Sequence, residues 1–256
     1  MVGRSSIIDP QSSKVPIIFA WLVHLYTASG AVVAFFALLF IEQAKFPEAF
    51  WLMALAVLID ASDGTLARLV RVKESIPWFD GDRLEDIVDY LNYVLVPSLF
   101  LIRADLLPQA DALWLAAVPL VASAYGFCQK EAKTEDHFFL GFPSYWNIVA
   151  FYLYILQMPR WINAFLILIL SALVFVPIKY LYPSRSPVFR DLTITLGILW
   201  GILVLVVIYQ LPQPATFIVF ASLLFPAYYV VLSLWIAARQ MVLRHQEVLN
   251  VPRGKK

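Results

Sequence analysis

Long apolar stretches alternate with short polar or proline-bearing joints along nearly the whole chain. A helix needs about 20 apolar residues to cross the hydrocarbon core of a bilayer, and most of these stretches approach that length. The pattern predicts about eight transmembrane helices, at residues 16–41, 47–69, 84–101, 112–129, 145–158, 161–178, 192–211 and 215–238. We therefore predict an all-α, polytopic membrane protein whose residues 1–256 form a single membrane-embedded domain.

The composition agrees with this prediction. Hydrophobic residues make up 61% of the chain and charged residues only 14%, whereas a soluble domain carries about 25% charged residues. No small-residue cleavage site follows the first apolar stretch, so it is predicted to remain as a span rather than to be removed as a signal. The single cysteine, Cys128, excludes an intramolecular disulfide and any multi-cysteine metal site. No nucleic-acid partner is expected.

The basic residues predict the orientation. If the N-terminus is cytoplasmic, sixteen of the nineteen Lys and Arg residues fall on the cytoplasmic side, and only Lys45, Arg103 and Arg160 fall on the other. Such an excess is the positive-inside pattern of membrane proteins. Both termini are therefore predicted to be cytoplasmic. The predicted cytoplasmic parts are the N-terminal segment 1–15, the charged stretch within 60–89, the loop 130–147 and the tail 239–256.

The stretch 60–89 gathers carboxylates inside an otherwise apolar chain. Asp60 and Asp63 lie one turn apart in the last turns of the second predicted helix, so they share a face. An ionised carboxylate at that depth is costly unless it is paired or bound to a metal. At the start of the third predicted helix, four more acids fall within an arc of roughly 100° and could face this pair: Asp82, Glu85, Asp86 and Asp89.

The residue types in this stretch favour chemistry on a phosphate. Mg²⁺ and Mn²⁺ take oxygen ligands, commonly a few carboxylates together with substrate phosphates. Gly64 and Ala67 lack bulk, which would let a phosphate approach the backbone, and Arg68 could bind a phosphate oxygen. We predict metal-assisted transfer at a pyrophosphate on the cytosolic surface of the membrane. The plainer alternative is a cluster of charges at helix ends, which is ordinary for any one of these residues.

The motif in this stretch resembles a known family. The order Asp60-x2-Asp63-Gly64-x2-Ala67-Arg68, then Gly81-x3-Glu85-x3-Asp89, is similar to the signature of the CDP-alcohol phosphotransferases. These membrane enzymes displace CMP from a CDP-linked donor with an alcohol. The twelve-residue spacer 69–80 is longer than is usual in the family and, with segment 130–147, resembles the bacterial phosphatidylcholine synthase subgroup. Glu85 departs from the motif, because the family has Asp there.

The resemblance implies a reaction and a location. It implies transfer of the phosphatidyl group from CDP-diacylglycerol to choline, with Mn²⁺ or Mg²⁺ at a two-metal site. It further implies a homodimer in the bacterial inner membrane, with an active site that faces the cytoplasm.

The resemblance also implies roles for the motif residues. Asp89 would act as the general base. The metal ions would be held by Asp60, Asp63, Glu85 and Asp89. Because Glu85 departs from the motif, Asp82 and Asp86 are candidate relief ligands for the metal. The CDP and diphosphate would be bound by Asp60, Gly64, Ala67, Arg68 and Gly81.

Choline would need a particular kind of site. Its quaternary ammonium has no N–H to donate, so aromatic faces and a nearby carboxylate recognise it. The candidate aromatic residues are Trp78, Tyr90, Tyr93, Tyr145 and Trp146, and the candidate counter-charges are Glu131, Glu135 and Asp136. Interfacial Tyr and Trp also form belts without any ligand, which is the alternative for each of these aromatics.

Two other functions remain open at this stage. A sister transferase that uses inositol, serine or glycerol phosphate would share the motif. The loop at 130–143 carries Lys130 and Lys133 among three acids, a balance that favours a cationic acceptor. A cation transporter would also use intramembrane carboxylates, but beside broken helices near the middle of the bilayer.

Overall fold

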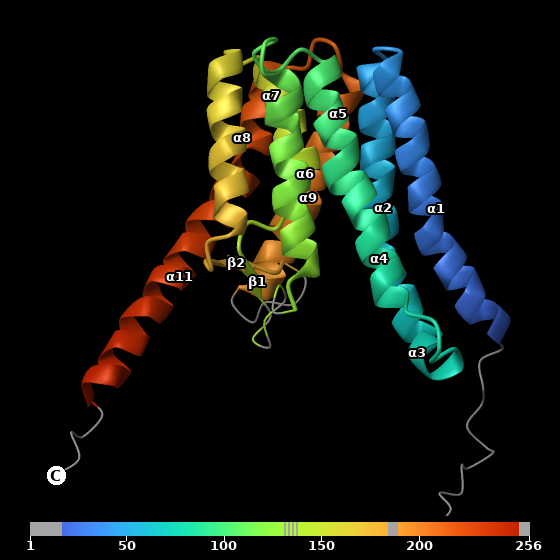
Figure 1. Ribbon diagram of the computed structural model, residues 1–256, viewed down its shortest axis with the longest axis vertical. Helices are drawn as coiled ribbons and strands as arrows, with labels where there is room; N and C mark the ends of the chain where they lie inside the picture. Colours follow the sequence, from blue (N-terminus) through green and yellow to red (C-terminus); the bar gives the residue numbers. More distant parts are fainter. Residues whose placement is uncertain are drawn as a thin grey trace, which may run out of the picture.

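Helices lie at all eight predicted segments (Figure 1). The structure is a computed structural model that describes residues 17–130, 132, 134, 136, 138–183 and 189–250, the last eleven by their backbone only. The described elements, in chain order, are α1 (Ile17–Glu42), α2 (Phe46–Leu69), α3 (Val72–Ser75), α4 (Gly81–Tyr90), the π-helical turn η1 (Leu91–Leu95), α5 (Val96–Arg103), α6 (Ala112–Cys128), β1 (Phe138–Leu140), α7 (Trp146–Leu156), α8 (Arg160–Val174), β2 (Lys179–Leu181), α9 (Arg190–Tyr209), α10 (Thr216–Ser222) and α11 (Leu224–Asn250).

The third predicted helix is built from three consecutive pieces, α4, η1 and α5. It begins at Gly81, earlier than predicted, because the Asp80 side chain accepts a hydrogen bond from the Arg83 amide and caps the first turn. Pro97 lies in the first turn of α5 and has no amide hydrogen to donate. In the turn before it, the Val96 amide donates to the Leu91 carbonyl, five residues back. This wide turn carries Asn92 and Tyr93.

Three elements were not predicted. The short helix α3 lies in the long spacer of the motif, and β1 pairs with β2 as an antiparallel two-stranded sheet with Phe138 opposite Leu181. The sheet docks on α11, since the Tyr229 hydroxyl donates to the Leu181 carbonyl and the Leu181 amide donates to Ser233 Oγ, both at 3.0 Å. The sixth predicted helix ends at Val174 rather than at residue 178, because the chain turns there toward β2.

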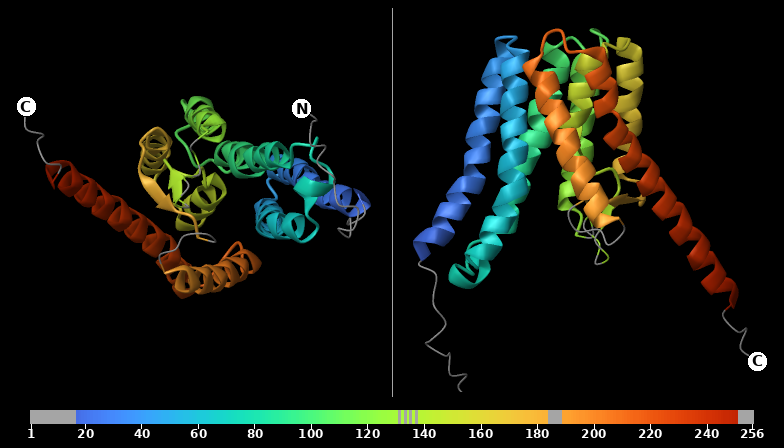
Figure 2. Two further views of the ribbon diagram at one scale, coloured as in Figure 1. Left: turned by 90° about the horizontal axis from the view of Figure 1, so that it is seen from below. Right: turned by 180° about the vertical axis from the view of Figure 1, so that it is seen from behind.

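The chain ends and the connections between helices gather at the two opposite ends of the bundle. The start of α1, the end of α11, the helix α3 and both strands lie toward the lower end of the bundle in Figure 1 and in the right-hand view of Figure 2. The joint between α1 and α2 and that between α7 and α8 lie at the opposite end. Two of the three basic residues predicted for that opposite side form ion pairs there, Arg103 with Glu42 and Arg160 with Asp105. The lower end, where Asp60–Asp89 lie, is called the carboxylate end below.

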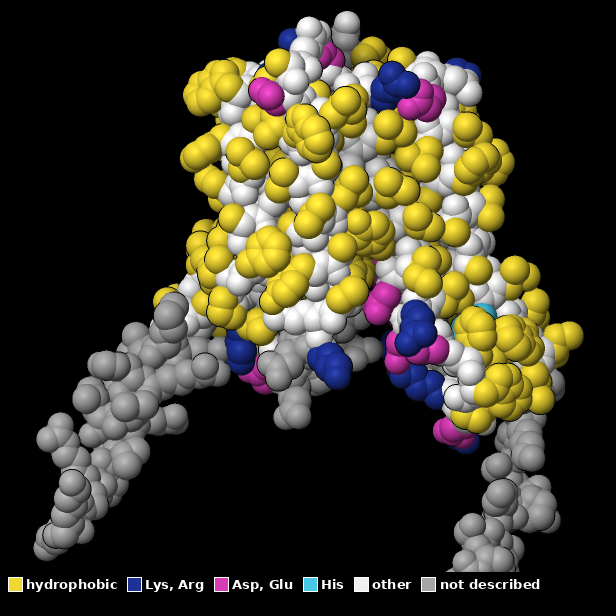
Figure 3. All heavy atoms as spheres, in the orientation of Figure 1, with side chains coloured by type: hydrophobic (Ala, Val, Ile, Leu, Met, Phe, Trp, Pro, Cys, Tyr) yellow, Lys and Arg dark blue, Asp and Glu magenta, His cyan; other side chains and the backbone are white. Residues whose placement is uncertain are grey.

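The outside of the bundle is apolar, which is what a membrane protein requires. Figure 3 shows hydrophobic side chains over most of the visible face, with charged groups gathered toward the two ends. Among the described residues, α1, α2, α9 and Thr216–Arg239 are long and apolar enough to cross a membrane, while α6, α7 and α8 are apolar but shorter. An all-α membrane protein is therefore confirmed, and the number of eight spans stays a prediction.

The packing of α1 against α4 depends on a glycine. A Cβ at Gly30 would lie 2.6 Å from Val88 Cγ1, so only glycine lets the two helices approach this closely. The Gly30 carbonyl oxygen accepts a buried 3.0 Å hydrogen bond from Asn92 Nδ2. Because α1 also packs along α2, this contact sets the distance between the two helices that carry the carboxylates.

Gly30→Ala is expected to lower the free energy of unfolding by about 1–3 kcal/mol, because the added methyl group overpacks the contact with Val88. Thermal unfolding of the purified protein in detergent measures the change. Adding Val88→Ala should restore most of the stability, since it removes the clashing Cγ1 atom. The matched control is Gly201→Ala, where nothing lies within 4 Å of the new Cβ. Equal destabilisation by both alanine substitutions would contradict the packing argument.

Candidate active site

Three carboxylates from two helices come together at the carboxylate end. Asp60 of α2 and Glu85 and Asp89 of α4 each place one oxygen within 4.8 Å of the others, and all three side chains are partly exposed. The helix α1 packs against both α2 and α4 and so holds the two groups face to face. An all-oxygen, negatively charged set of this size fits a hard divalent cation. We call Asp60, Glu85 and Asp89 the carboxylate trio.

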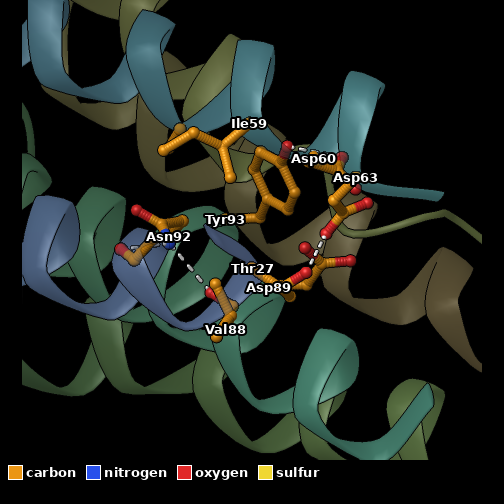
Figure 4. Close-up of a pocket in the computed structure, with 10 residues that line it drawn as sticks. Thr27, Ile59, Asp60, Asp63, Val88, Asp89, Asn92 and Tyr93 are labelled. Carbon is orange, nitrogen blue, oxygen red and sulfur yellow. Dashed lines mark hydrogen bonds between the residues drawn. The ribbon is translucent and has the colours of Figure 1, made fainter. Parts of the chain in front are cut away.

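Asp63 lies next to the trio but in a different setting. Its side chain is buried, and Oδ2 accepts a 2.9 Å hydrogen bond from Thr27 Oγ1 on α1. Asp63 lines the same small pocket as Asp60 and Asp89 (Figure 4). Its predicted role as a metal ligand stays a prediction, because its oxygens are not among those that the trio brings together.

Two hydroxyl groups orient the aspartates of α2. Tyr93 in η1 donates a 2.7 Å hydrogen bond to Asp60 Oδ2, as Thr27 does to Asp63 Oδ2 (Figure 4). A hydrogen bond to one carboxylate oxygen fixes the side-chain rotamer and leaves the second oxygen to bind a cation. Thr27 is not among the predicted site residues, because nothing in the first apolar segment distinguishes it. Tyr93 was predicted as a choline-binding aromatic residue, and in the structure its hydroxyl group positions Asp60.

Tyr93→Phe is expected to weaken divalent-metal affinity by about 10–100-fold, because Asp60 loses the group that orients it. The metal concentration at half-maximal activity measures this effect. Tyr90→Phe is the matched control, since the Tyr90 hydroxyl instead donates to the Leu120 carbonyl, at 2.9 Å. A similar change in both variants would show that Tyr93 acts only through packing.

The four acids of α4 are divided by the structure. Glu85 lies at one edge of the predicted arc and Asp89 near its middle, and both join Asp60, whereas Asp86 lies at the other edge. The Asp82 carboxylate is exposed and pairs with Lys73 Nζ at 2.7 Å. Asp86 is partly exposed and is not part of the trio. The additional ligand roles of Asp82 and Asp86 stay predictions.

The predicted nucleotide-binding residues follow Asp60 down α2. Gly64 is partly exposed beside the Arg68 guanidinium, whose Nη2 donates to Thr65 Oγ1 at 3.0 Å. Arg68 is exposed at the carboxylate end and is thus open to a phosphate. The Ala67 side chain packs against a buried cluster of α1 and α3 residues. The small residue there therefore also serves helix packing.

Gly81 has a packing role beside its predicted one. A Cβ at this position would lie 2.6 Å from Cε1 of His24, a buried side chain of α1. The absence of a side chain lets the first turn of α4 rest on the His24 ring.

The aromatic residues predicted for the acceptor are scattered. Trp146 is buried and its indole N–H donates to Ser123 Oγ at 2.8 Å, while Trp78 is 72% exposed on the spacer between α3 and α4. The ring of Tyr90 packs against Phe127, on α6. Tyr145, in contrast, interacts electrostatically with Asp60 and Asp89.

The acids predicted as counter-charges for choline differ in what the structure shows of them. Asp136 forms an ion pair with Lys179 of β2. Burial alone would raise the pKa of Asp136, but hydrogen bonds from Lys179 and Thr134 outweigh it and lower that pKa. Glu131 and Glu135 lie outside the described residues.

Comparison with known proteins gives a consistent result. No protein-family model matches the chain. A phosphatidylcholine synthase of Legionella pneumophila is 43% identical and aligns with 84% of this chain and 88% of its own length. One of Pseudomonas aeruginosa is 42% identical, with 86% and 93% covered, and one of Legionella bozemanae is 50% identical, with 60% and 72% covered. At this identity and coverage, the chain belongs to the bacterial phosphatidylcholine synthase family.

Proposed function

We propose that the protein transfers the phosphatidyl group of CDP-diacylglycerol to choline, which yields phosphatidylcholine and CMP. The observation that carries this proposal is the carboxylate trio, which joins both halves of the motif in a chain whose relatives are phosphatidylcholine synthases. The trio lies toward one end of the bundle. A transporter would instead place such groups near mid-bilayer, so the position favours an enzyme that works at the membrane surface.

The chemistry of the trio supports a direct displacement. The choline oxygen bonds to the phosphorus that carries diacylglycerol, the bond from that phosphorus to the CMP oxygen breaks, and the hydroxyl proton passes to Asp89. Arg68 would bind a diphosphate oxygen. Asp60, Glu85 and Asp89 would hold Mg²⁺ or Mn²⁺, with Asp63 beside them for a second ion. A bound divalent ion would neutralise the diphosphate and so make CMP a better leaving group.

A product assay tests the reaction. Purified protein would be incubated with Mg²⁺ or Mn²⁺, CDP-diacylglycerol and, separately, choline, ethanolamine, serine, inositol or glycerol phosphate. The expected result is phosphatidylcholine and an equal amount of CMP, with little product from the other alcohols. Efficient use of another acceptor, with none of choline, would leave only a sister transferase that shares the motif.

We also propose that all eight helical segments cross the bacterial inner membrane, with both termini and the active site on the cytoplasmic side. The common placement of the α1 start and the α11 end supports an even number of crossings (Figure 2). The described basic residues support the orientation, since two of the three at the opposite end, Arg103 and Arg160, form ion pairs. The resemblance to its family suggests a homodimer.

Single-cysteine labelling is expected to show this topology. In a Cys128→Ser background, Lys130→Cys should react with a membrane-impermeant maleimide only in inside-out vesicles. Gln43→Cys, in the joint between α1 and α2, is the matched control and should react in spheroplasts with the outer membrane removed. Labelling of both positions from the same side would contradict the proposed arrangement.

A further inference from the structure

We infer that the quaternary ammonium of the acceptor binds to an aromatic wall made of Phe139, Tyr145 and Tyr182, with Tyr229 behind it. This inference rests on the proposed function and assigns the acceptor subsite to residues that lie far apart in the sequence. Phe139 belongs to β1, Tyr182 follows β2, Tyr145 precedes α7 and Tyr229 belongs to α11.

The rings of the wall contact one another. Phe139 stacks on Tyr182, with ring centroids 4.5 Å apart, and meets Tyr145 edge to face at 6.4 Å. Tyr145 in turn meets Tyr229 edge to face at 6.1 Å. Phe139, Tyr145 and Tyr182 are partly exposed, whereas Tyr229 is buried. The three partly exposed rings are therefore the candidates for contact with a ligand, and Tyr229 supports them.

The wall is held in place from behind. The Tyr145 hydroxyl hydrogen-bonds to that of Tyr229, which donates to the Leu181 carbonyl of β2. The pairing of β1 with β2 then places Phe139 beside the residue that follows Leu181. The small sheet, whose strands are about forty residues apart in the chain, therefore brings two of the rings together.

The wall lies beside the carboxylate trio. Tyr145 lies within electrostatic range of Asp60 and Asp89, so this ring of the wall is near the trio. Figure 3 shows an acidic side chain in the recess where the helices part at the carboxylate end. Choline links its hydroxyl oxygen to its nitrogen through two carbons, a span of at most about 3.8 Å for three bonds of about 1.5 Å each. The ammonium must therefore bind next to the carboxylate that takes the hydroxyl proton.

The chemistry of the wall matches a trimethylammonium group. Such a cation cannot donate an N–H hydrogen bond, and the electron-rich faces of aromatic rings attract it, more strongly where water is excluded. The negative trio adds attraction on the other side. Trp146 and Tyr90 are committed to packing and Trp78 lies on the outer spacer, so none of the three replaces these rings.

Removing a ring should weaken choline use selectively. Tyr182→Leu and Phe139→Leu are each expected to raise the KM for choline by about tenfold, because each loses one face of a cation–π site. The KM for CDP-diacylglycerol and the metal requirement should remain as in wild type. Tyr182→Phe keeps the ring and should keep the wild-type KM for choline. Tyr125→Leu is the matched control, since Tyr125 is an exposed aromatic that packs on Phe175 outside the wall.

A neutral analogue separates charge recognition from shape. 3,3-Dimethyl-1-butanol has the shape of choline with a carbon in place of nitrogen, so wild type should use it far less well, and both leucine variants should discriminate less. Thermal unfolding of each variant, with and without choline, reports folding and binding without turnover. The proposed wall would be contradicted if both leucine variants kept the wild-type KM for choline. It would also be contradicted if wild type used choline and the analogue equally well. If wild type made no phosphatidylcholine at all, the proposed function itself would fail, and that result is distinct from either of these.

Discussion

Replacing Asp89 by Asn is expected to reduce phosphatidylcholine synthesis by about 10²–10⁴-fold, the usual contribution of a general base. The amide of Asn is nearly the same size as the carboxyl group, but it cannot accept the proton of the attacking hydroxyl. Asp89 lies in the carboxylate trio and within electrostatic reach of Tyr145, so it is close to both the diphosphate and the acceptor subsites. The measurement is kcat for CMP release at saturating choline.

The control for this prediction is Asp82→Asn. Asp82 is on the same helix, but its carboxylate is exposed and paired with Lys73, so activity should be retained. At saturating Mg²⁺ or Mn²⁺, binding of CDP-diacylglycerol to the Asp89 variant should remain close to that of wild type, because the base acts on the acceptor. Near-normal turnover by Asp89→Asn would remove this residue from the proton transfer.

Removal of divalent metal is expected to abolish activity completely, and Mg²⁺ or Mn²⁺ should restore it. Metal binding should also stabilise the fold, by about 2.7 kcal/mol at a free metal concentration one hundred times Kd. Asp60→Asn should lose both the restored activity and the metal-dependent increase in Tm, because it withdraws one of the three converging oxygens. Thermal unfolding across a metal titration measures the second effect without turnover.

Asp136→Asn serves as the matched control for the metal titration. Asp136 is also an acid near the carboxylate end, but it pairs with Lys179 and is not part of the trio. Its metal dependence should equal that of wild type. If chelation left activity unchanged, or if Asp60→Asn kept the full metal-dependent stabilisation, the trio would not be the metal site.

The trio also explains the departure at Glu85. The family motif has Asp at this position, and the sequence left open whether Glu85 or a neighbouring acid takes that role. In the structure the Glu85 oxygen reaches the same point as those of Asp60 and Asp89. The spacing between α2 and α4 therefore accommodates the extra methylene group of Glu85. That spacing cannot be predicted from a local sequence pattern.

Local periodicity was enough to determine the helices and the site of the carboxylates. Apolar length predicts helices wherever the backbone must satisfy its own hydrogen bonds in lipid, so all eight segments could be located from sequence. The four-residue spacing of Glu85 and Asp89 put both on one helix face, which depends only on helix geometry. The motif and its long spacer were likewise sufficient for the family.

Only the tertiary structure decided which neighbours those side chains meet. Tyr145 and Trp146 are adjacent in the sequence, yet one interacts with the trio and the other is buried against Ser123. Thr27 had no distinguishing pattern until α1 packed beside α2, and Tyr182 reaches Phe139 only through the pairing of β1 with β2. The physical reason is that helix formation depends on residues within a few positions of one another, whereas contacts between elements depend on packing between segments that are distant in the chain.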